Sequence, residues 1–225
     1  MQADIHPATK AVAGVLRVTE IFLSLQGETR SVGLPTVFVR LTGCPLRCGY
    51  CDTAYAFHGG ERMGIEAVVE RVADAGVRHV TITGGEPLAQ PASLELTRAL
   101  CDLGYAVSIE TSGALDISAI DPRVARIVDM KTPGSGECAR NRLENLALLG
   151  SLDQVKFVIC DAADYDWSVD FVRTHKLAQR CEVLFSPVTP GLAPRTLADW
   201  IVRDRLPVRF QIQLHKFLWG DERGR

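Results

Sequence analysis

Three cysteines stand close together in the first quarter of the chain, and their spacing can hold a metal cluster. Cys44, Cys48 and Cys51 form the arrangement Cys-x3-Cys-x2-Cys. Gly43, Pro45 and Gly49 permit the tight turns of a compact loop. A structural zinc site or a fully ligated iron–sulfur electron carrier normally uses four protein ligands. Three thiolates around a four-iron cube leave one iron open, and an open metal position is where chemistry can take place.

The same loop has an alternative interpretation as a zinc knuckle whose fourth ligand lies far away in the sequence. No second Cys-x2-Cys pair and no His pair stands near it, and His58 is alone. A lone histidine is more often a surface or packing residue than a ligand. The remaining cysteines are scattered, and we expect them to be small buried apolar side chains: Cys101, Cys138, Cys160 and Cys181.

The composition is that of an ordinary globular protein. The chain has 225 residues, 47% of them hydrophobic and 23% charged, with 25 Lys and Arg against 27 Asp and Glu. This balance excludes a disordered or collagen-like chain. A net charge of −2 argues against a nucleic-acid-binding role, which usually requires a basic excess. No apolar run reaches the roughly 18 residues of a membrane-spanning helix.

The first residues, MQADIHPATKAVAGV, lack the apolar core of a secretion signal. We therefore expect a cytoplasmic protein, in which clustered thiols indicate metal or redox chemistry rather than disulfides. Residues 1–15 are predicted to be a disordered leader, and residues 16–225 a single domain.

Short apolar runs rich in β-branched residues alternate with segments of helical periodicity. Seven runs are predicted to be strands: Thr36–Leu41, His79–Thr83, Ala106–Thr111, Arg126–Lys131, Gln154–Ile159, Glu182–Val188 and Val208–Leu214. Helices are predicted over Ile65–Ala75, Leu94–Leu103, Asp161–Leu177 and Ala193–Leu206. Repeated strand–helix units imply a parallel sheet with right-handed crossovers. The predicted fold is α/β, an incomplete (β/α) barrel or a doubly wound sheet, with the site at the carboxyl ends of the strands.

Polar and glycine-rich turns follow the predicted strands at that end. The strand His79–Thr83 runs into Gly-Gly-Glu-Pro, where two glycines allow a ligand to approach the backbone closely. Glu110, Asp129 and Lys131 stand at the ends of the next two strands, and a charge there is costly unless it is paired, hydrated or bound to a ligand. Salt bridges across the barrel mouth are the alternative for Glu110 and Asp129, whereas Lys131 and the turn after it favour cofactor binding.

Together with these turns, the cysteine loop resembles the motif of the radical S-adenosylmethionine superfamily. The resemblance implies a 4Fe–4S cluster held by Cys44, Cys48 and Cys51, whose open iron binds the amino and carboxylate groups of S-adenosylmethionine. One electron then splits the cofactor into methionine and a 5'-deoxyadenosyl radical. The resemblance also implies a set of residues that contact the cofactor: Tyr50, Cys51, Asp52, Gly85, Glu86, Lys131, Pro133, Gly134 and Ser135.

Three segments, one of which includes two of the cysteines, make the resemblance more specific. Residues 20–29 read EIFLSLQGET, residues 48–53 read CGYCDT and residues 211–216 read QIQLHK. All three segments resemble the 7-carboxy-7-deazaguanine synthase family, and the resemblance covers nearly the whole chain after the leader. It implies a lyase reaction in which 6-carboxy-5,6,7,8-tetrahydropterin undergoes ring contraction and loses ammonia. The product would be 7-carboxy-7-deazaguanine, for queuosine or a related 7-deazapurine pathway.

The resemblance also implies magnesium, bound by Thr53 together with the substrate carboxylate and water. The alternative for Thr53 is a helix N-cap. The planar fork of Arg40 suits a carboxylate, although strand alternation alone leaves open that it faces solvent. The residues expected to contact the pterin are Leu25, Gln26, Gly27, Glu28, Arg40, Thr83 and Arg225. No catalytic group is expected beyond the cluster and the cofactor radical.

Two other functions stay open on the sequence. A glycyl-radical enzyme activase has a similar size and cysteine spacing but acts on a protein glycine, and the block SLQGE argues against it. A non-catalytic iron–sulfur or zinc-binding sensor would lack a cofactor pocket. For the synthase we expect a small-molecule substrate, a reducing protein such as flavodoxin or ferredoxin, a homodimer, and no nucleic-acid or membrane partner.

Overall fold

Within residues 14–225, which the computed structural model describes, one curved sheet of nine strands forms the centre of the molecule. The strands are β1 (Val15–Leu25), β2 (Pro35–Leu41), β3 (Glu61–Gly64), β4 (His79–Gly84), β5 (Ala106–Thr111), β6 (Ala125–Met130), β7 (Gln154–Ile159), β8 (Glu182–Pro187) and β9 (Arg209–Phe210). The α-helices are α1 (Ile65–Asp74), α2 (Ala92–Asp102), α3 (Ala162–Thr174), α4 (Pro194–Asp204) and α5 (Leu214–Trp219). Apart from its last two residues, the predicted leader lies outside the described residues and stays a prediction.

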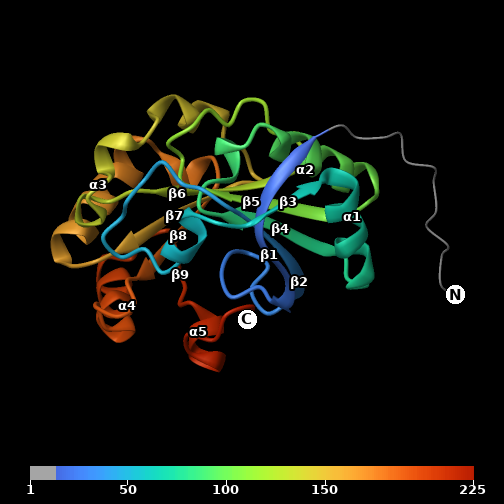
Figure 1. The fold of residues 1–225 in the computed structure, drawn as a ribbon. Helices are drawn as coiled ribbons and strands as arrows, with labels where there is room; N and C mark the ends of the chain where they lie inside the picture. The colour runs from blue at the N-terminus through green and yellow to red at the C-terminus, as the bar shows by residue number, and fades with distance from the viewer. Residues whose placement is uncertain (1–13) are drawn as a thin grey trace, which may run out of the picture.

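The sheet is mostly parallel and open. Its strand order is β3-β1-β2-β4-β5-β6-β7-β8-β9; β1 pairs antiparallel with β2 and β3, and every later pair is parallel. Figure 1 shows the sheet curving through the molecule, with α1, α2 and α3 along its outer side. The central strands are buried on both faces, as the neighbouring residues Val80 and Thr81 of β4 illustrate: they point to opposite faces and are 0% and 1% exposed. The predicted α/β fold with an incomplete barrel of mostly parallel strands is confirmed.

Six of the predicted strands lie where expected to within one residue, and the prediction of a strand over Val208–Leu214 is wrong for most of its length. Within the segment Val208–Leu214 only Arg209–Phe210, the strand β9, pairs with β8. The amides of Gln211 and Gln213 then donate to Glu28 in the loop after β1, and the Leu214 N–H donates to the Gly27 carbonyl at 2.9 Å. These contacts draw the segment away from the sheet, and α5 begins where the strand was expected to end.

The elements β1, β3 and α5 are absent from the sequence prediction. In its first half β1 alternates exposed and buried residues, with Leu16 and Val18 inside, a pattern unlike the continuous apolar runs of the central strands. The four predicted helices agree with α1 to α4 to within three residues at each end. However, the connections from β5 to β6 and from β6 to β7 contain only loops and 3-10 helices in place of α-helices. None of the helices in residues 14–225 is long and apolar enough to cross a membrane.

Candidate functional site

The carboxyl ends of the parallel strands and the cysteine loop after β2 enclose one pocket. The segment Leu25–Glu28 and the chain end also reach it. The strands β4 to β8 each contribute residues at the edge of the sheet predicted for the site. The lining includes Thr83, Gly84, Gly85, Glu110, Thr111, Ser112, Asp129, Lys131, Lys156, Val158, Ser186, Pro187, Val188 and Thr189.

Cys44, Cys48 and Cys51 all line this pocket as partly exposed free thiols. The loop is folded by its own backbone, since the Cys51 N–H donates to the Cys48 carbonyl at 3.1 Å. Burial raises the pKa of the Cys44 and Cys48 thiols, and a bound metal ion would favour their thiolate forms. No three His, Cys, Asp or Glu side chains of residues 14–225 converge on a single ion; thiolates that bind separate irons of a cube need no such convergence.

The turn Gly84-Gly85 packs directly against the cysteine loop. A Cβ on Gly85 would clash with the Gly43 carbonyl oxygen and would lie 2.9 Å from Cys44 Cβ, so only glycine allows this approach. Gly84 has a φ of +146° and lies equally close to Leu41. The two glycines therefore let the end of β4 support the loop, and Gly85 also lines the pocket.

Glu86, expected from the sequence to contact the cofactor, is fully buried and already hydrogen-bonded. It accepts from the Leu88 N–H at 3.0 Å, the Thr111 hydroxyl at 2.8 Å and the Ser112 N–H at 2.7 Å. The side chain does not line the pocket formed by the described residues. In this arrangement Glu86 ties the turn after β4 to the end of β5, and its contact with the cofactor stays a prediction.

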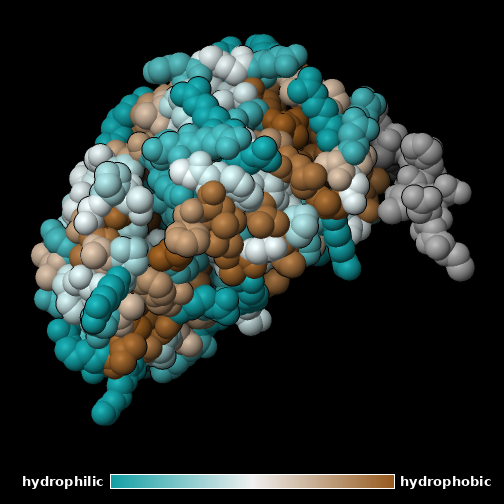
Figure 2. Space-filling view, turned by 90° about the horizontal axis from the view of Figure 1, so that it is seen from below, coloured by the Kyte–Doolittle hydropathy of each residue, from teal (hydrophilic) through white to brown (hydrophobic). Residues whose placement is uncertain are grey.

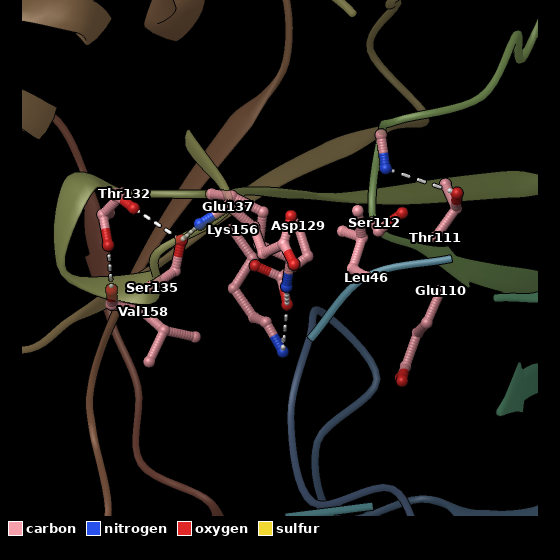
Figure 3. A network of polar contacts seen from close by, with 12 residues as sticks. Leu46, Glu110, Thr111, Ser112, Asp129, Thr132, Ser135, Glu137, Lys156 and Val158 are labelled. Atoms are coloured by element: carbon pink, nitrogen blue, oxygen red, sulfur yellow. Dashed lines mark hydrogen bonds and ion pairs between the residues drawn. The ribbon is translucent and has the colours of Figure 1, made fainter. Parts of the chain in front are cut away.

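Pro133, Gly134 and Ser135 form the short 3-10 helix η3 (Pro133–Ser135) after β6, also outside the lining of the pocket. Figure 3 shows the hydrogen bonds that shape this turn: the Ser135 hydroxyl donates to the Thr132 carbonyl at 2.6 Å and accepts from the Glu137 N–H at 3.1 Å. The Ser135 carbonyl accepts from the Gly49 N–H at 3.0 Å. The turn is thus joined to the cysteine loop between the second and third cysteines.

A network of buried charges lies in the pocket. Lys156 Nζ lies 2.8 Å from Glu28 and 3.7 Å from Asp129, and Lys131 Nζ lies 3.0 Å from the same Asp129 oxygen. Burial by itself lowers the pKa of both lysines, but the neighbouring carboxylates outweigh it and the pKa of each is raised. Both lysines are therefore ammonium ions at neutral pH. The salt bridge considered as an alternative for Asp129 is present.

Glu110 lies in the same pocket but is held by neutral donors. Thr83 Oγ1 donates to it at 3.0 Å and Gln26 Nε2 at 3.4 Å. Burial raises the pKa of the Glu110 carboxyl, and Glu28 adds to this effect while Lys156 opposes it. The Gln26 amide also donates to Thr81 at 3.2 Å. The side chain of Gln26 therefore holds its neighbours, and its backbone is held too, since its N–H donates to the Leu34 carbonyl at 2.9 Å and its carbonyl accepts from the Gly33 N–H at 2.8 Å.

Arg40 faces the pocket rather than open solvent, with its side chain 17% exposed. Its Nε donates to Glu20 at 2.7 Å. The guanidinium lies 5.8 Å from the centre of the Phe22 ring and 5.9 Å from that of Tyr55. Among the described residues only the Nε of this guanidinium is hydrogen-bonded, so its terminal amino groups are available for a ligand. The last residue, Arg225, lines the same pocket.

Thr53 stands at the N-cap position of the 3-10 helix η1 (Ala54–Phe57), but its hydroxyl makes no capping hydrogen bond. It donates instead to Asp52 at 2.8 Å. Asp52 is also held by Lys216 Nζ at 2.8 Å and Gln213 Nε2 at 3.1 Å; although burial raises the pKa of Asp52, these contacts outweigh it and lower the pKa. Thr53 lines the pocket. Its hydroxyl oxygen accepts no hydrogen bond from residues 14–225, so it can bind a hard cation such as Mg²⁺.

Two buried polar atoms beside the cysteines have no hydrogen-bond partner among the described residues: Tyr50 OH and Asp129 Oδ1. Burying a polar group without a partner is costly, so a ligand that carries hydrogen-bonding groups accounts for both. Lys131 Nζ lies 5.8 Å from the centre of the Tyr50 ring and adds a cation at this end of the pocket. The residues present therefore fit a cluster with a polar cofactor beside it, such as S-adenosylmethionine.

Several lining residues are missing from the sequence expectations. Lys156 had a signal, because a lysine in the middle of an apolar strand needs a buried partner. His215 and Lys216 had a signal too, because they end the segment QIQLHK that resembles the family; burial lowers the pKa of His215, which favours the neutral imidazole. For the residues at the end of β8 the only signal was their position at the carboxyl end of a predicted strand. The residues concerned are Lys156, Ser186, Pro187, Val188, Thr189, His215 and Lys216.

Comparison with known proteins gives a consistent set of relatives. The family model of the radical SAM superfamily matches residues 38–132. The 7-carboxy-7-deazaguanine synthase of Chlorobaculum tepidum is 44% identical over 93% of this chain and 97% of its own. That of Koribacter versatilis is 43% identical over 92% and 98%. The crystal structure of QueE from Escherichia coli has the same fold, with a TM-score of 0.70 and 23% identity over 89% of this chain and 95% of that one.

Proposed function

The chain belongs to the 7-carboxy-7-deazaguanine synthase family of the radical S-adenosylmethionine superfamily, and from this membership we propose that it converts 6-carboxy-5,6,7,8-tetrahydropterin into 7-carboxy-7-deazaguanine and ammonia. The observation that carries the proposal is that the three cysteines, the buried charges and the segment Leu25–Glu28 line one pocket. An activase or a non-catalytic sensor is not favoured, because the synthases match nearly the whole chain.

In this proposal Cys44, Cys48 and Cys51 hold the 4Fe–4S cluster. When bound, the cluster and S-adenosylmethionine supply a carbon-centred radical that removes a hydrogen atom from the substrate. The chain's own residues bind and orient the cofactor and the substrate. The two unpartnered atoms are proposed to form hydrogen bonds with the cofactor: the Tyr50 hydroxyl as donor or acceptor, and Asp129 Oδ1 as acceptor. Gly85 and Lys131 are proposed to contact the cofactor beside them.

The pterin is proposed to bind on the other side of the pocket. Glu28 accepts from the amino group of its pyrimidine edge, while Lys156 at 2.8 Å balances the charge of that carboxylate. Leu25 and Gly27 offer backbone groups, and Thr83 contacts the ring. The terminal amino groups of Arg40 bind the pterin carboxylate, and Arg225 closes the pocket from the chain end.

Arg40→Ala is expected to raise the KM for the carboxylated pterin by about tenfold to a hundredfold, because a charge-assisted pair with the carboxylate is lost. The change should be larger in KM than in kcat, since the radical machinery is untouched. Steady-state kinetics of the reconstituted enzyme measure both. Arg62→Ala, at an exposed position of β3, is the matched control and should behave as wild type. An unchanged KM for Arg40→Ala would remove the carboxylate contact.

Magnesium is proposed to bind the Thr53 hydroxyl together with water and the substrate carboxylate. Thr53→Ala is expected to reduce the stimulation of turnover by Mg²⁺ by about tenfold, because one oxygen ligand is lost. Thr53→Ser keeps the hydroxyl and should retain the stimulation. Titration of activity with MgCl₂ measures the effect. If Thr53→Ala lowers thermal stability while its magnesium dependence stays normal, the residue has only a structural role.

We also propose a homodimer, a cytoplasmic location and a flavodoxin or ferredoxin as reductant. All seven cysteines are free, as expected of a reducing compartment.

The proposed dimer is supported by exposed apolar side chains. Phe217 and Leu218 of α5 and Val202 of α4 are exposed, with 77% of Phe217 accessible. Figure 2 shows hydrophobic residues gathered in patches on the face seen from below. Such patches favour an interface. Light scattering measures the oligomeric state.

A single anaerobic assay tests the reaction. The protein is reconstituted with iron and sulfide, and dithionite, S-adenosylmethionine, Mg²⁺ and 6-carboxytetrahydropterin are added before mass spectrometry. A product lighter than the substrate by one ammonia is expected. If only methionine and 5'-deoxyadenosine form, the superfamily chemistry stands and the substrate assignment is wrong. If neither forms although the cluster is loaded, the sensor becomes the better interpretation.

A further inference from the structure

Asp164 lies in the first turn of α3 with only 1% of its surface exposed. Its Oδ1 accepts from the Gly134 N–H at 2.7 Å. Its Oδ2 accepts from the Thr132 hydroxyl at 2.8 Å and from the Cys160 N–H at 3.1 Å. One buried carboxylate therefore joins the turn after β6 to the segment between β7 and α3.

The position of Asp164 explains how a carboxylate is stabilised there by neutral donors. It is the third residue of α3, where the helix dipole favours a negative charge. The Asp161 side chain caps the same helix and accepts from the Asp164 N–H at 2.9 Å. Hydrogen bonds to an ionised acceptor are stronger than those between neutral groups. The three donors from Thr132, Gly134 and Cys160 are consequently held firmly in place.

Close packing makes the contact specific to this turn. A Cβ on Gly134 would meet Asp164 Oδ2 at 2.5 Å and Cys160 Cβ at 3.0 Å. Only glycine therefore allows the turn to come so close to the carboxylate. The Val158 carbonyl oxygen also lies 3.1 Å from the Thr132 hydroxyl, so the single hydroxyl hydrogen is shared between this carbonyl and Asp164. The turn is fixed against both β7 and α3.

The same turn supports the cysteine loop. The Ser135 carbonyl accepts from the Gly49 N–H at 3.0 Å, and a carboxylate oxygen of Glu137 accepts from the Arg47 N–H at 2.6 Å. These two N–H groups flank Cys48 in the sequence. The contacts run without a break from Asp164 through the turn to the backbone on both sides of the second cysteine.

We propose that Asp164 is a positioning residue for the cofactor end of the site: it fixes the turn Thr132–Ser135, and through it the Cys48 segment of the loop, where S-adenosylmethionine binds. Asp164 does not line the pocket formed by the described residues, so it acts through these neighbours. The inference rests on the proposed function in one respect only, that S-adenosylmethionine is the ligand of this end.

Asp153 provides a matched control. It too is 1% exposed, and it accepts from the Gly150 N–H at 2.8 Å and from Arg126 through its backbone N–H at 3.0 Å and its Nε at 2.9 Å. It lies just before β7 and therefore at the opposite edge of the sheet from the cysteines. A general loss of stability should affect Asp153→Asn and Asp164→Asn alike, whereas an effect on the cofactor should be confined to Asp164→Asn.

The experiment compares both variants with wild type as reconstituted holoenzymes, and measures melting temperature, iron per chain and the Kd for S-adenosylmethionine. For Asp164→Asn, at equal iron content, we expect the Kd to be about tenfold higher, because one charge-assisted hydrogen bond is lost. We also expect the cluster's electron paramagnetic resonance signal to change less when the cofactor is added. Asp153→Asn should lower the melting temperature and leave the Kd unchanged.

Equal Kd values for Asp164→Asn and wild type at equal iron content would overturn the proposal, as would equal rises in both variants. If Asp164→Asn does not fold, Thr132→Val removes one donor at nearly constant volume, and it should raise the Kd about threefold; an unchanged Kd would again overturn the proposal. The proposed function fails separately, if the wild-type enzyme binds and cleaves S-adenosylmethionine but leaves the pterin unchanged.

Discussion

Cys48→Ala is expected to lose the 4Fe–4S cluster and to turn over at least about a thousandfold more slowly than wild type, because two thiolates do not retain a cube with an open iron. Cys48 is the middle cysteine of the loop and is proposed to be a cluster ligand. The backbone on both sides of it is held by the segment after β6. The loop should therefore keep its fold when the sulfur is removed. Iron and sulfide analysis, visible absorption and product formation measure the loss.

The matched control is Cys101→Ala. Cys101 is also a partly exposed free cysteine, but it lies in α2 and does not line the pocket of the described residues. It should keep its iron and its turnover, at a cost in stability of about 1 kcal/mol for the lost packing. A Cys48→Ala protein with full iron content and normal turnover would show that Cys48 is no ligand.

The parts of the site that the sequence predicts are those built from neighbouring residues. Cys44, Cys48 and Cys51 share one loop, so their spacing alone indicates a cluster. Gly84 and Gly85 directly follow an apolar strand, and the need for glycine at a close backbone approach is a local property. The edge of the sheet that holds the site also follows from the sequence, since parallel strands carry their polar turns at one end.

The parts that the sequence does not predict depend on contacts between distant segments. A carboxylate after a strand can point into the pocket or toward the next strand, and Glu86 makes its hydrogen bonds to the end of β5. The strand expected over Val208–Leu214 fails for a similar reason, because Gln211 and Gln213 find a partner in Glu28, far away in the sequence. The hydrophobic periodicity of the sequence indicates neither of these contacts.

Lys156 also depends on contacts between distant segments, since its ammonium group lies beside Glu28 and Asp129. Its replacement has the second large expected effect. Lys156→Met keeps the apolar stem but leaves Glu28 and Asp129 without their shared ammonium group. Both partners of the closer pair are largely buried, with side-chain exposures of 13% for Lys156 and 12% for Glu28. Removing one member of a buried pair typically lowers the free energy of unfolding by about 3 kcal/mol. Turnover should fall as well, because Glu28 lines the pocket and is proposed to contact the substrate.

The pH dependence and the double variant separate this charge effect from lost packing. Carboxylates hold the pKa of Lys156 well above 10.5 against the effect of burial, so its stabilising contribution is fully present below pH 10.5 and is lost only as pH rises through the higher folded-state value. Between pH 6 and 9 the stability difference between wild type and Lys156→Met should therefore be constant. Adding Glu28→Gln removes the stranded charge and should restore about half or more of the lost stability in urea unfolding. A double variant as unstable as the sum of the two single ones would show that Lys156 contributes through packing, and that its charge does not hold Glu28 in the pocket.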